Sequence, residues 1–129
     1  MEYSEFITHV QSLAQSTSRA EAERATLATI ETIEERIGSA EAQELVAQLP
    51  DELRNYLKTG KQESAKSFNL QEFIARTSQK ENIDPVMAVN HVRAVFAVLQ
   101  NAVTPEIFKA FHSHFSHDYE ELFTTAPTT

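Results

Sequence analysis

Histidines are the side chains of this 129-residue sequence best suited to bind a metal ion or to transfer protons near neutral pH. His9 stands alone, and the other four fall in the second half of the chain. The candidate metal ligands are His91, His112, His114 and His117. Their imidazoles, with the carboxylate of Asp118, would suit zinc, copper or nickel.

The spacing of these histidines is poor for a metal site on one helix. Ligands that share a helix face lie three or four residues apart. His112 and His114 are separated by about 200° around a helix. His114 and His117 have a suitable spacing, but Ser116 between them is predicted to cap a new helix. We therefore predict no metal or cofactor site.

The sequence pattern predicts how far each of these four histidines is buried. His91 and His112 fall near apolar stripes, so we expect them at the boundary of the core, with His112 hydrogen-bonded through a ring nitrogen. We expect His114 and His117 to face water. The predicted aromatic neighbours of His112 are Phe108, Phe111 and Phe115. A metal ion that joins His112 to His91, from another helix, is the alternative interpretation.

No set of residues has the composition of a known catalytic site. The absence of cysteine excludes a thiolate nucleophile and thiolate metal ligands. Two glycines are too few for a phosphate-binding loop, and no nucleophile elbow occurs. Glu31, Glu34 and Glu35 are predicted to form a solvated polar face. We therefore predict that the protein is not an enzyme.

The charge of the chain argues against nucleic acid as a partner. The formal net charge is −8. Residues 1–66 carry 12 acidic and 7 basic side chains, and residues 67–129 carry 7 and 4, so neither half is basic. Phosphate backbones require clustered Lys and Arg. No run reaches the roughly 20 apolar residues of a membrane span, and the N-terminus does not resemble a secretory signal. We expect a cytoplasmic protein without membrane insertion.

Apolar residues recur at helical spacing throughout the chain. Ile30, Ile33 and Ile37 share one face, as do Val92, Phe96 and Leu99. The pattern predicts eight helices, near residues 3–15, 19–37, 40–48, 50–58, 70–81, 85–103, 105–114 and 117–123. The phenylalanines of the second half are expected to fill the space between these helices. The alternative is that they form a groove for a partner helix or an apolar ligand, or a dimer face.

Capping residues support the predicted helix starts. Ser18 and Asn69 each precede a glutamate by three residues, the capping-box spacing. Asp84 and Thr104 each precede a proline, which is favoured at the first helical position. Gly38 is predicted to end the second helix in the left-handed conformation.

The two halves of the chain share a pattern of residue class and spacing. Glu5-Phe6-Ile7 recurs as Glu72-Phe73-Ile74, and a stretch near Ile30 aligns with a stretch near Phe96. We therefore predict an all-α fold of two tandem, pseudo-equivalent four-helix repeats, packed as one compact helical domain. The predicted parts are a first repeat at 1–58, a linker at 59–68, a second repeat at 69–123 and a flexible tail at 124–129.

Several short motifs resemble a known family. They are Tyr3, Glu5-Phe6, Ala22-Glu23-Arg24-Ala25-Thr26, Glu34-Glu35-Arg36, and Ala47-Gln48-Leu49-Pro50 with Leu53. Together they resemble the bacterial domain-of-unknown-function family numbered 2267, over about residues 3–123. The second half departs from the pattern, with Phe115-Ser116 in place of Leu49-Pro50. The resemblance implies an all-helical, duplicated fold and a small stress-associated bacterial protein. It implies no activity for particular residues.

We therefore expect a non-enzymatic protein-interaction or stress-associated module with a protein partner, able to form homo-oligomers. One alternative is a metal- or pH-responsive protein that uses the histidines of the second half. Another is a protein that binds an apolar ligand in a cleft between the repeats.

Overall fold

Helices make up all the regular secondary structure of residues 1–57 and 64–123, the part of the chain that the computed structural model describes. They are α1 (Tyr3–Ala14), α2 (Arg19–Ile37), α3 (Ser39–Ala47), α4 (Asp51–Leu57), α5 (Leu70–Glu81), α6 (Pro85–Ala102), α7 (Pro105–His112), a 3₁₀ turn η1 (His117–Tyr119) and α8 (Glu120–Phe123). The predicted all-α class is confirmed. None of these described helices is long and apolar enough to span a bilayer.

The predicted caps start four of the helices. The side chains of Ser18 and Asn69 each accept a hydrogen bond from the backbone N–H three residues later. At the proline-initiated helices α6 and α7, the side chain of Asp84 accepts from the backbone N–H two residues later and that of Thr104 from the N–H three residues later. These bonds satisfy N–H groups that a helix leaves without an internal partner, so the helix starts could be read from local sequence.

The predicted C-terminal boundaries were less accurate. The helix predicted at 105–114 ends at His112, because the next N–H groups form a tighter turn in which His114 N donates to Phe111 O. The helix predicted at 117–123 is divided into η1 and α8. Residue 58, residues 59–63 of the predicted linker and the predicted tail at 124–129 lie outside the described residues. Residues 64–69 of the linker region carry no regular secondary structure.

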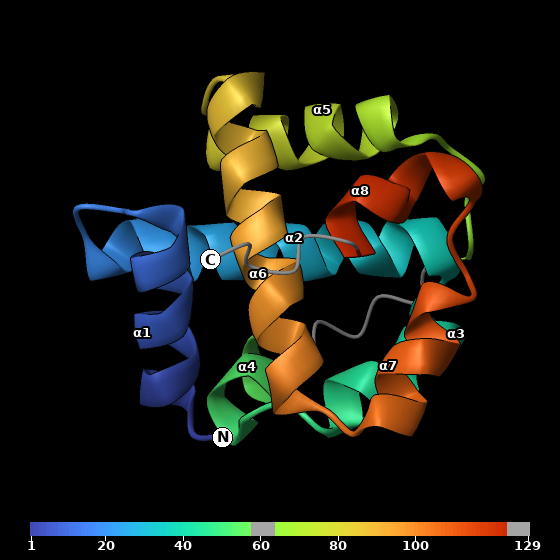
Figure 1. The fold of residues 1–129 in the computed structure, drawn as a ribbon, viewed down its shortest axis with the longest axis horizontal. Coiled ribbons are helices and arrows are strands. Elements are labelled where there is room, and N and C mark those ends of the chain that lie inside the picture. Colours follow the sequence, from blue (N-terminus) through green and yellow to red (C-terminus); the bar gives the residue numbers. More distant parts are fainter. Residues whose placement is uncertain (58–63, 124–129) are drawn as a thin grey trace.

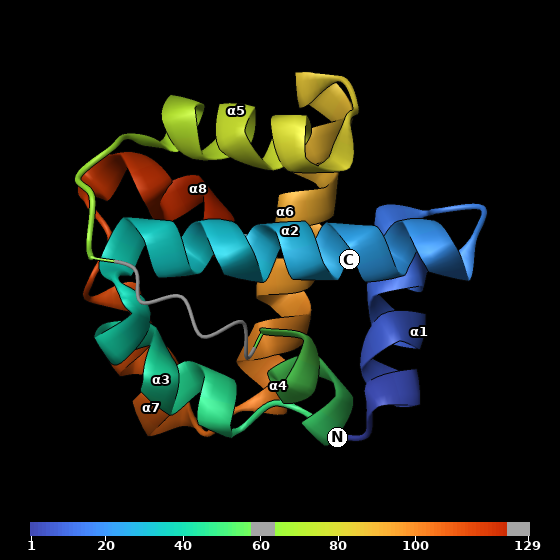
Figure 2. The same cartoon turned by 180° about the vertical axis from the view of Figure 1, so that it is seen from behind.

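Two long helices, α2 and α6, cross at the centre of the molecule and organise the others (Figure 1). α1 packs against both of them, and so does α5. Seen from both sides, α1 lies beside α6 and α5 lies beside α2 (Figure 2). α3 and α7 contact each other at the end of the structure away from α1. Elements distant in sequence are therefore interleaved around one core.

Phenylalanine rings fill the core between α5, α6, α7 and α8. Phe73 and Phe96 are fully buried, with ring centroids 6.0 Å apart in an edge-to-face arrangement. Phe111 is buried beside Phe96, while Phe108 and Phe115 are partly buried against the same cluster. The predicted packing role of these rings is confirmed for the cluster as a whole.

An arginine at the end of α2 joins this aromatic cluster to the chain that precedes α5. Arg36 Nε donates a hydrogen bond to the carbonyl of Phe68 at 2.8 Å. Its guanidinium lies 5.3 Å from the centroid of Tyr119 and 5.7 Å from that of Phe115, within the range of cation–π attraction. The Tyr119 hydroxyl donates to the same carbonyl at 2.7 Å, and burial raises the pKa of Tyr119 to about 12. The tyrosine therefore stays neutral and keeps its donor proton.

Gly38 connects α2 to α3 with φ +92° and ψ 151°. Its φ is positive as expected, but its ψ is extended, so the predicted left-handed helical conformation is wrong. This region of backbone space is essentially restricted to glycine. A Cβ at this position would also lie 3.1 Å from the backbone nitrogen of Ala65.

We predict that Gly38→Ala lowers the free energy of unfolding by about 1–3 kcal/mol, because the backbone of the new alanine must keep a positive φ that is strained for a residue with a Cβ. Urea denaturation followed by circular dichroism measures the change. The control is Glu44→Ala at an exposed position in α3, expected to change stability by less than about 0.5 kcal/mol. A Gly38→Ala protein as stable as this control would show that the connection tolerates a side chain.

Candidate functional site

The most unusual polar group in the described core is a buried imidazole held between two carboxylates. His91, in the first half of α6, is 2% exposed. Its Nδ1 lies 2.8 Å from Oε1 of Glu81, at the C-terminal end of α5. Its Nε2 lies 3.0 Å from Oε2 of Glu21, in the first turn of α2. One ring therefore joins three helices.

Both ring nitrogens must carry protons if both contacts are to be hydrogen bonds. Carboxylate oxygens only accept, and the imidazolium donates from both nitrogens, whereas neutral imidazole donates from one. The hydrogen bond to Glu81 is the main cause that raises the pKa of His91 above its ordinary value. Burial acts in the opposite direction, and the charges of Glu81 and Glu21 reinforce the rise. The geometry thus favours a charged histidine in the core.

The two carboxylates differ in their access to water. The side chain of Glu81 is 1% exposed and that of Glu21 is 20% exposed. The second oxygen of Glu81, Oε2, has no hydrogen-bond partner among the described residues. Glu81 consequently depends on His91 for the compensation of its charge, whereas Glu21 can turn towards solvent.

The other histidines of the second half occupy surface positions. His112 is partly exposed, and its Nε2 lies 2.6 Å from Glu120 Oε2, so the predicted hydrogen bond of a ring nitrogen is confirmed. Its ring stacks on Phe123 at 4.0 Å, an aromatic neighbour that the sequence pattern did not single out. His114 is exposed as predicted, with Nε2 3.4 Å from Glu41 of α3, and His117 is exposed in η1.

The candidate metal ligands do not converge. His91 bonds to carboxylates of α2 and α5, whereas His112 faces Glu120 and Phe123. Within residues 1–57 and 64–123, no group of three or more histidine or acidic side chains is placed to hold a metal ion. Zinc needs such a set at about 2.0–2.2 Å from one point.

We predict that calorimetric titration of the metal-free protein with zinc at neutral pH gives no sub-micromolar binding. Any weak binding is expected to persist in His91→Ala and His112→Ala, because neither residue belongs to a converging set of ligands. Tight binding that one of these changes abolishes in a still-folded protein would contradict the prediction.

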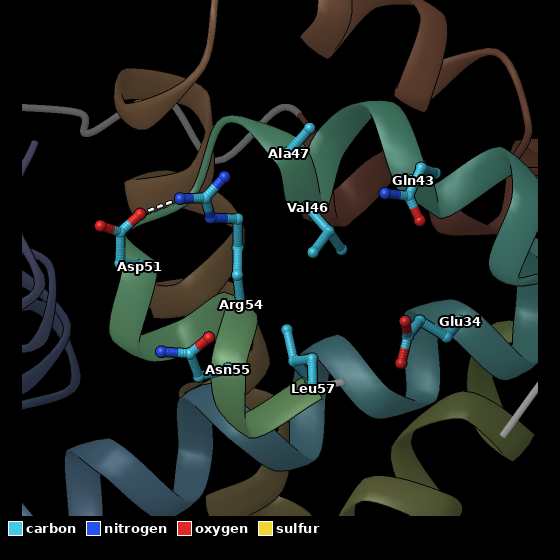
Figure 3. A pocket seen from close by; sticks show the side chains of 8 residues that line it. All are labelled: Glu34, Gln43, Val46, Ala47, Asp51, Arg54, Asn55 and Leu57. Atoms are coloured by element: carbon cyan, nitrogen blue, oxygen red, sulfur yellow. Dashed lines mark hydrogen bonds and ion pairs between the residues drawn. The ribbon is translucent and has the colours of Figure 1, made fainter. Parts of the chain in front are cut away.

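A surface hollow of about 540 Å³ lies among α2, α3 and α4 (Figure 3). We call it the α2–α4 hollow, and its lining residues are Glu34, Gln43, Val46, Ala47, Asp51, Arg54, Asn55 and Leu57. Val46 and Leu57 project into the space, with Glu34 on one side of it and Arg54 on the other, paired to Asp51. Two apolar side chains therefore face the middle of the hollow, and polar side chains of both charge signs surround them.

A smaller hollow of about 310 Å³ lies between α1 and α6, which belong to opposite halves of the chain. We call it the α1–α6 hollow, and its lining residues are Met1, His9, Ser12, Leu13, Val98 and Asn101. Leu13 is 52% exposed and Met1 is 45% exposed. These two exposed side chains give the α1–α6 hollow its apolar character.

The motifs that carry the family resemblance form contacts between helices. The hydroxyl of Tyr3 donates to Glu23 at 2.5 Å and joins α1 to α2. Glu35 accepts from Lys80 at 2.7 Å and from Arg76 at 3.2 Å, which joins α2 to α5. Burial opposes the ionisation of Glu35, but these two cations outweigh it and hold its pKa below the usual range. These motif residues fix the positions of helices.

Comparison with known proteins places this chain in a family. A family model described as "Uncharacterized conserved protein (DUF2267)" matches residues 3–122. The chain belongs to the DUF2267 family. No curated protein matches it. The match covers nearly the whole of the described structure, including both carboxylates that hold His91.

In this DUF2267 member, the sequence pattern points to His91 but not to its partners. In the sequence, Glu21 has only the spacing of a capping-box residue, and Glu81 only the position of a predicted helix end. One signal was available for Glu81. It follows Phe73 and Thr77 at four-residue steps, a spacing that places it on the buried face of α5.

Proposed function

We propose that this DUF2267 protein is a non-enzymatic module that binds a partner protein through the α2–α4 hollow. The observation that supports the proposal is the composition of the hollow. An apolar centre within a polar rim is the usual anatomy of a protein-binding surface. Val46 and Leu57 offer a place for one apolar side chain of the partner, while Arg54 and Glu34 offer charged contacts on either side.

The proposal assigns structural roles to the other polar clusters. The family motif residues join helices, and His91 is enclosed in the core, where a substrate has no access. The acidic surface favours a partner with a basic or neutral face, because like charges across an interface are unfavourable. We propose that the protein acts in the cytoplasm.

Site-specific photo-cross-linking in the native cell tests this function. A photoreactive residue at Gln43 or Asn55 of the hollow is expected to trap the same partner protein. The matched control is the same residue at Gln71, exposed on α5 away from the hollow. Adding Val46→Glu, which places a charge in the middle of the hollow, is expected to abolish the adduct. Equal trapping from Gln71, or an adduct unaffected by Val46→Glu, would contradict the proposal.

A second candidate function is the binding of a small apolar ligand in the α1–α6 hollow. The supporting observation is the exposure of Leu13 and Met1 around this hollow. Its volume of about 310 Å³ is at the lower end of the range for ligand sites. A fluorescent apolar probe that binds the wild type and not Leu13→Glu would favour this function.

We also propose that the chain is a duplicated unit in which the first helix of each half packs on the long helix of the other half. The packing supports this interpretation: α1 contacts α6 of the other half, and α5 contacts α2. Each short first helix thus packs on the long helix of the opposite half as well as on its own. In such an arrangement neither half can bury its apolar surface alone.

A further inference from the structure

The position of His91 makes it a connection between two parts of the fold. α5 and α6 are consecutive helices joined by residues 82–84, and Glu81 and His91 lie on either side of this turn. Glu21 belongs to the first turn of α2, far earlier in the chain. The imidazole therefore joins the start of α2 to the α5–α6 hairpin.

We propose that His91 is a proton-controlled latch that holds the first turn of α2 against the α5–α6 hairpin. With protons on both ring nitrogens, the latch is closed and donates to Glu21 and to Glu81. Loss of the Nε2 proton to solvent opens the Glu21 side only. This device is independent of the proposed partner-binding function.

The two carboxylates decide which side opens. Neutral imidazole has one N–H, so it can satisfy one carboxylate and presents a lone pair to the other. Glu81 is 1% exposed and cannot reach water, so the remaining proton is best placed on Nδ1. The lone pair of Nε2 then faces an oxygen of Glu21 at 3.0 Å, which is repulsive. Glu21 is 20% exposed and relieves the repulsion by turning outwards.

The surroundings of the ring define the groups that control it. The titratable groups that face His91 are Glu81 from α5 and Glu21 from α2. α1 also packs on α6, and there the contact is neutral: the Asn90 side chain donates to the carbonyl of Ala14 at 2.8 Å. Asn90 thus forms a neighbouring connection that contains no titratable group.

The direction of the pH dependence follows from the raised pKa of His91. A raised folded-state pKa gives stability that is fully present below the unfolded value of about 6.5. That stability is lost as the pH rises through the folded-state pKa. The latch is therefore closed at mildly acidic pH and opens on the alkaline side.

Hydrogen exchange of the full chain at pH 6 and pH 8.5, corrected for intrinsic exchange rates, tests the latch. We expect protection of amides in residues 19–25 to fall at the higher pH relative to amides of α7. The fall is expected to be up to about tenfold for each unit by which the pKa of His91 exceeds about 6.5. An NMR titration of the His91 ring identifies the group that titrates.

Two variants separate the latch from general packing. His91→Gln retains N–H donors on its side-chain amide and has no titrating group, so its relative protection in residues 19–25 should not differ between the two pH values. Asn90→Ala removes the neutral connection and should retain the pH response of the wild type. A wild-type response that is absent, or that persists in His91→Gln, would overturn the proposal, as would a ring that titrates at or below pH 6.5. The wild-type measurements stand even if a variant does not fold.

Discussion

Replacement of Phe73 by alanine is expected to lower the free energy of unfolding by about 3–5 kcal/mol. Phe73 is completely buried in α5. Its ring contacts Phe96 at 6.0 Å and Tyr119 at 5.8 Å, both edge to face. Alanine would remove this apolar surface and leave a cavity that a well-packed core cannot close. Urea denaturation followed by circular dichroism and tyrosine fluorescence measures the loss.

Tyr56→Ala is the matched control for Phe73→Ala. Tyr56 is an aromatic residue of α4 that is 62% exposed. Its replacement is expected to change stability by about 0.5 kcal/mol or less, since surface changes away from special contacts are nearly neutral. A loss below about 1 kcal/mol for Phe73→Ala would show that the aromatic cluster does not act as a cohesive core.

The helices of this protein could be predicted because their signals are local. The stripes of apolar side chains depend on residues three or four apart, and each cap depends on residues two or three apart. The helix at 70–81 was predicted with both boundaries correct, and the cap at Asn69 marks its start. The weaker predictions concerned the ends of short helices, such as α7, where a few hydrogen bonds decide the boundary.

The way in which the helices pack could not be predicted from the same signals. Sequence similarity between the halves suggests neighbouring repeats, whereas the observed core interleaves α1 with α6 and α5 with α2. Such pairings depend on complementary surfaces between distant segments. The hydrogen bond from Thr77 to Thr32, buried at 3.1 Å between α5 and α2, is an example. Neither threonine had a sequence feature that indicated its partner.

The candidate site shows the same limit more sharply. An imidazole beside an apolar stripe suggests a histidine at the boundary of the core, whereas the structure buries His91 inside the core. Its hydrogen bond to Glu21 spans 70 positions of the sequence, so no local pattern connects them. A charged residue on a buried face does require compensation. That physical requirement indicates a partner without identifying it.

The second large effect is expected at the buried pair. His91→Leu is expected to lower the free energy of unfolding by about 3–5 kcal/mol, because it leaves the enclosed carboxylate of Glu81 without a compensating charge. The double variant His91→Leu with Glu81→Leu is expected to regain most of that loss. Apolar residues of similar volume often replace a buried ion pair at little net cost. Glu21, which is partly exposed, can turn to solvent in both variants.

A double-mutant cycle measures this coupling directly. The four proteins are wild type, the two single variants and the double variant, each unfolded in urea at pH 6, where His91 is charged. The coupling is expected to be large, because each single change strands the other member of the pair. His112→Leu is the control. It breaks the contact with Glu120 at the surface, where both side chains are more than a third exposed, and it is expected to cost less than about 1 kcal/mol. If the losses of the two single variants simply add, the carboxylate of Glu81 does not depend on His91, and this buried pair does not hold the three helices together.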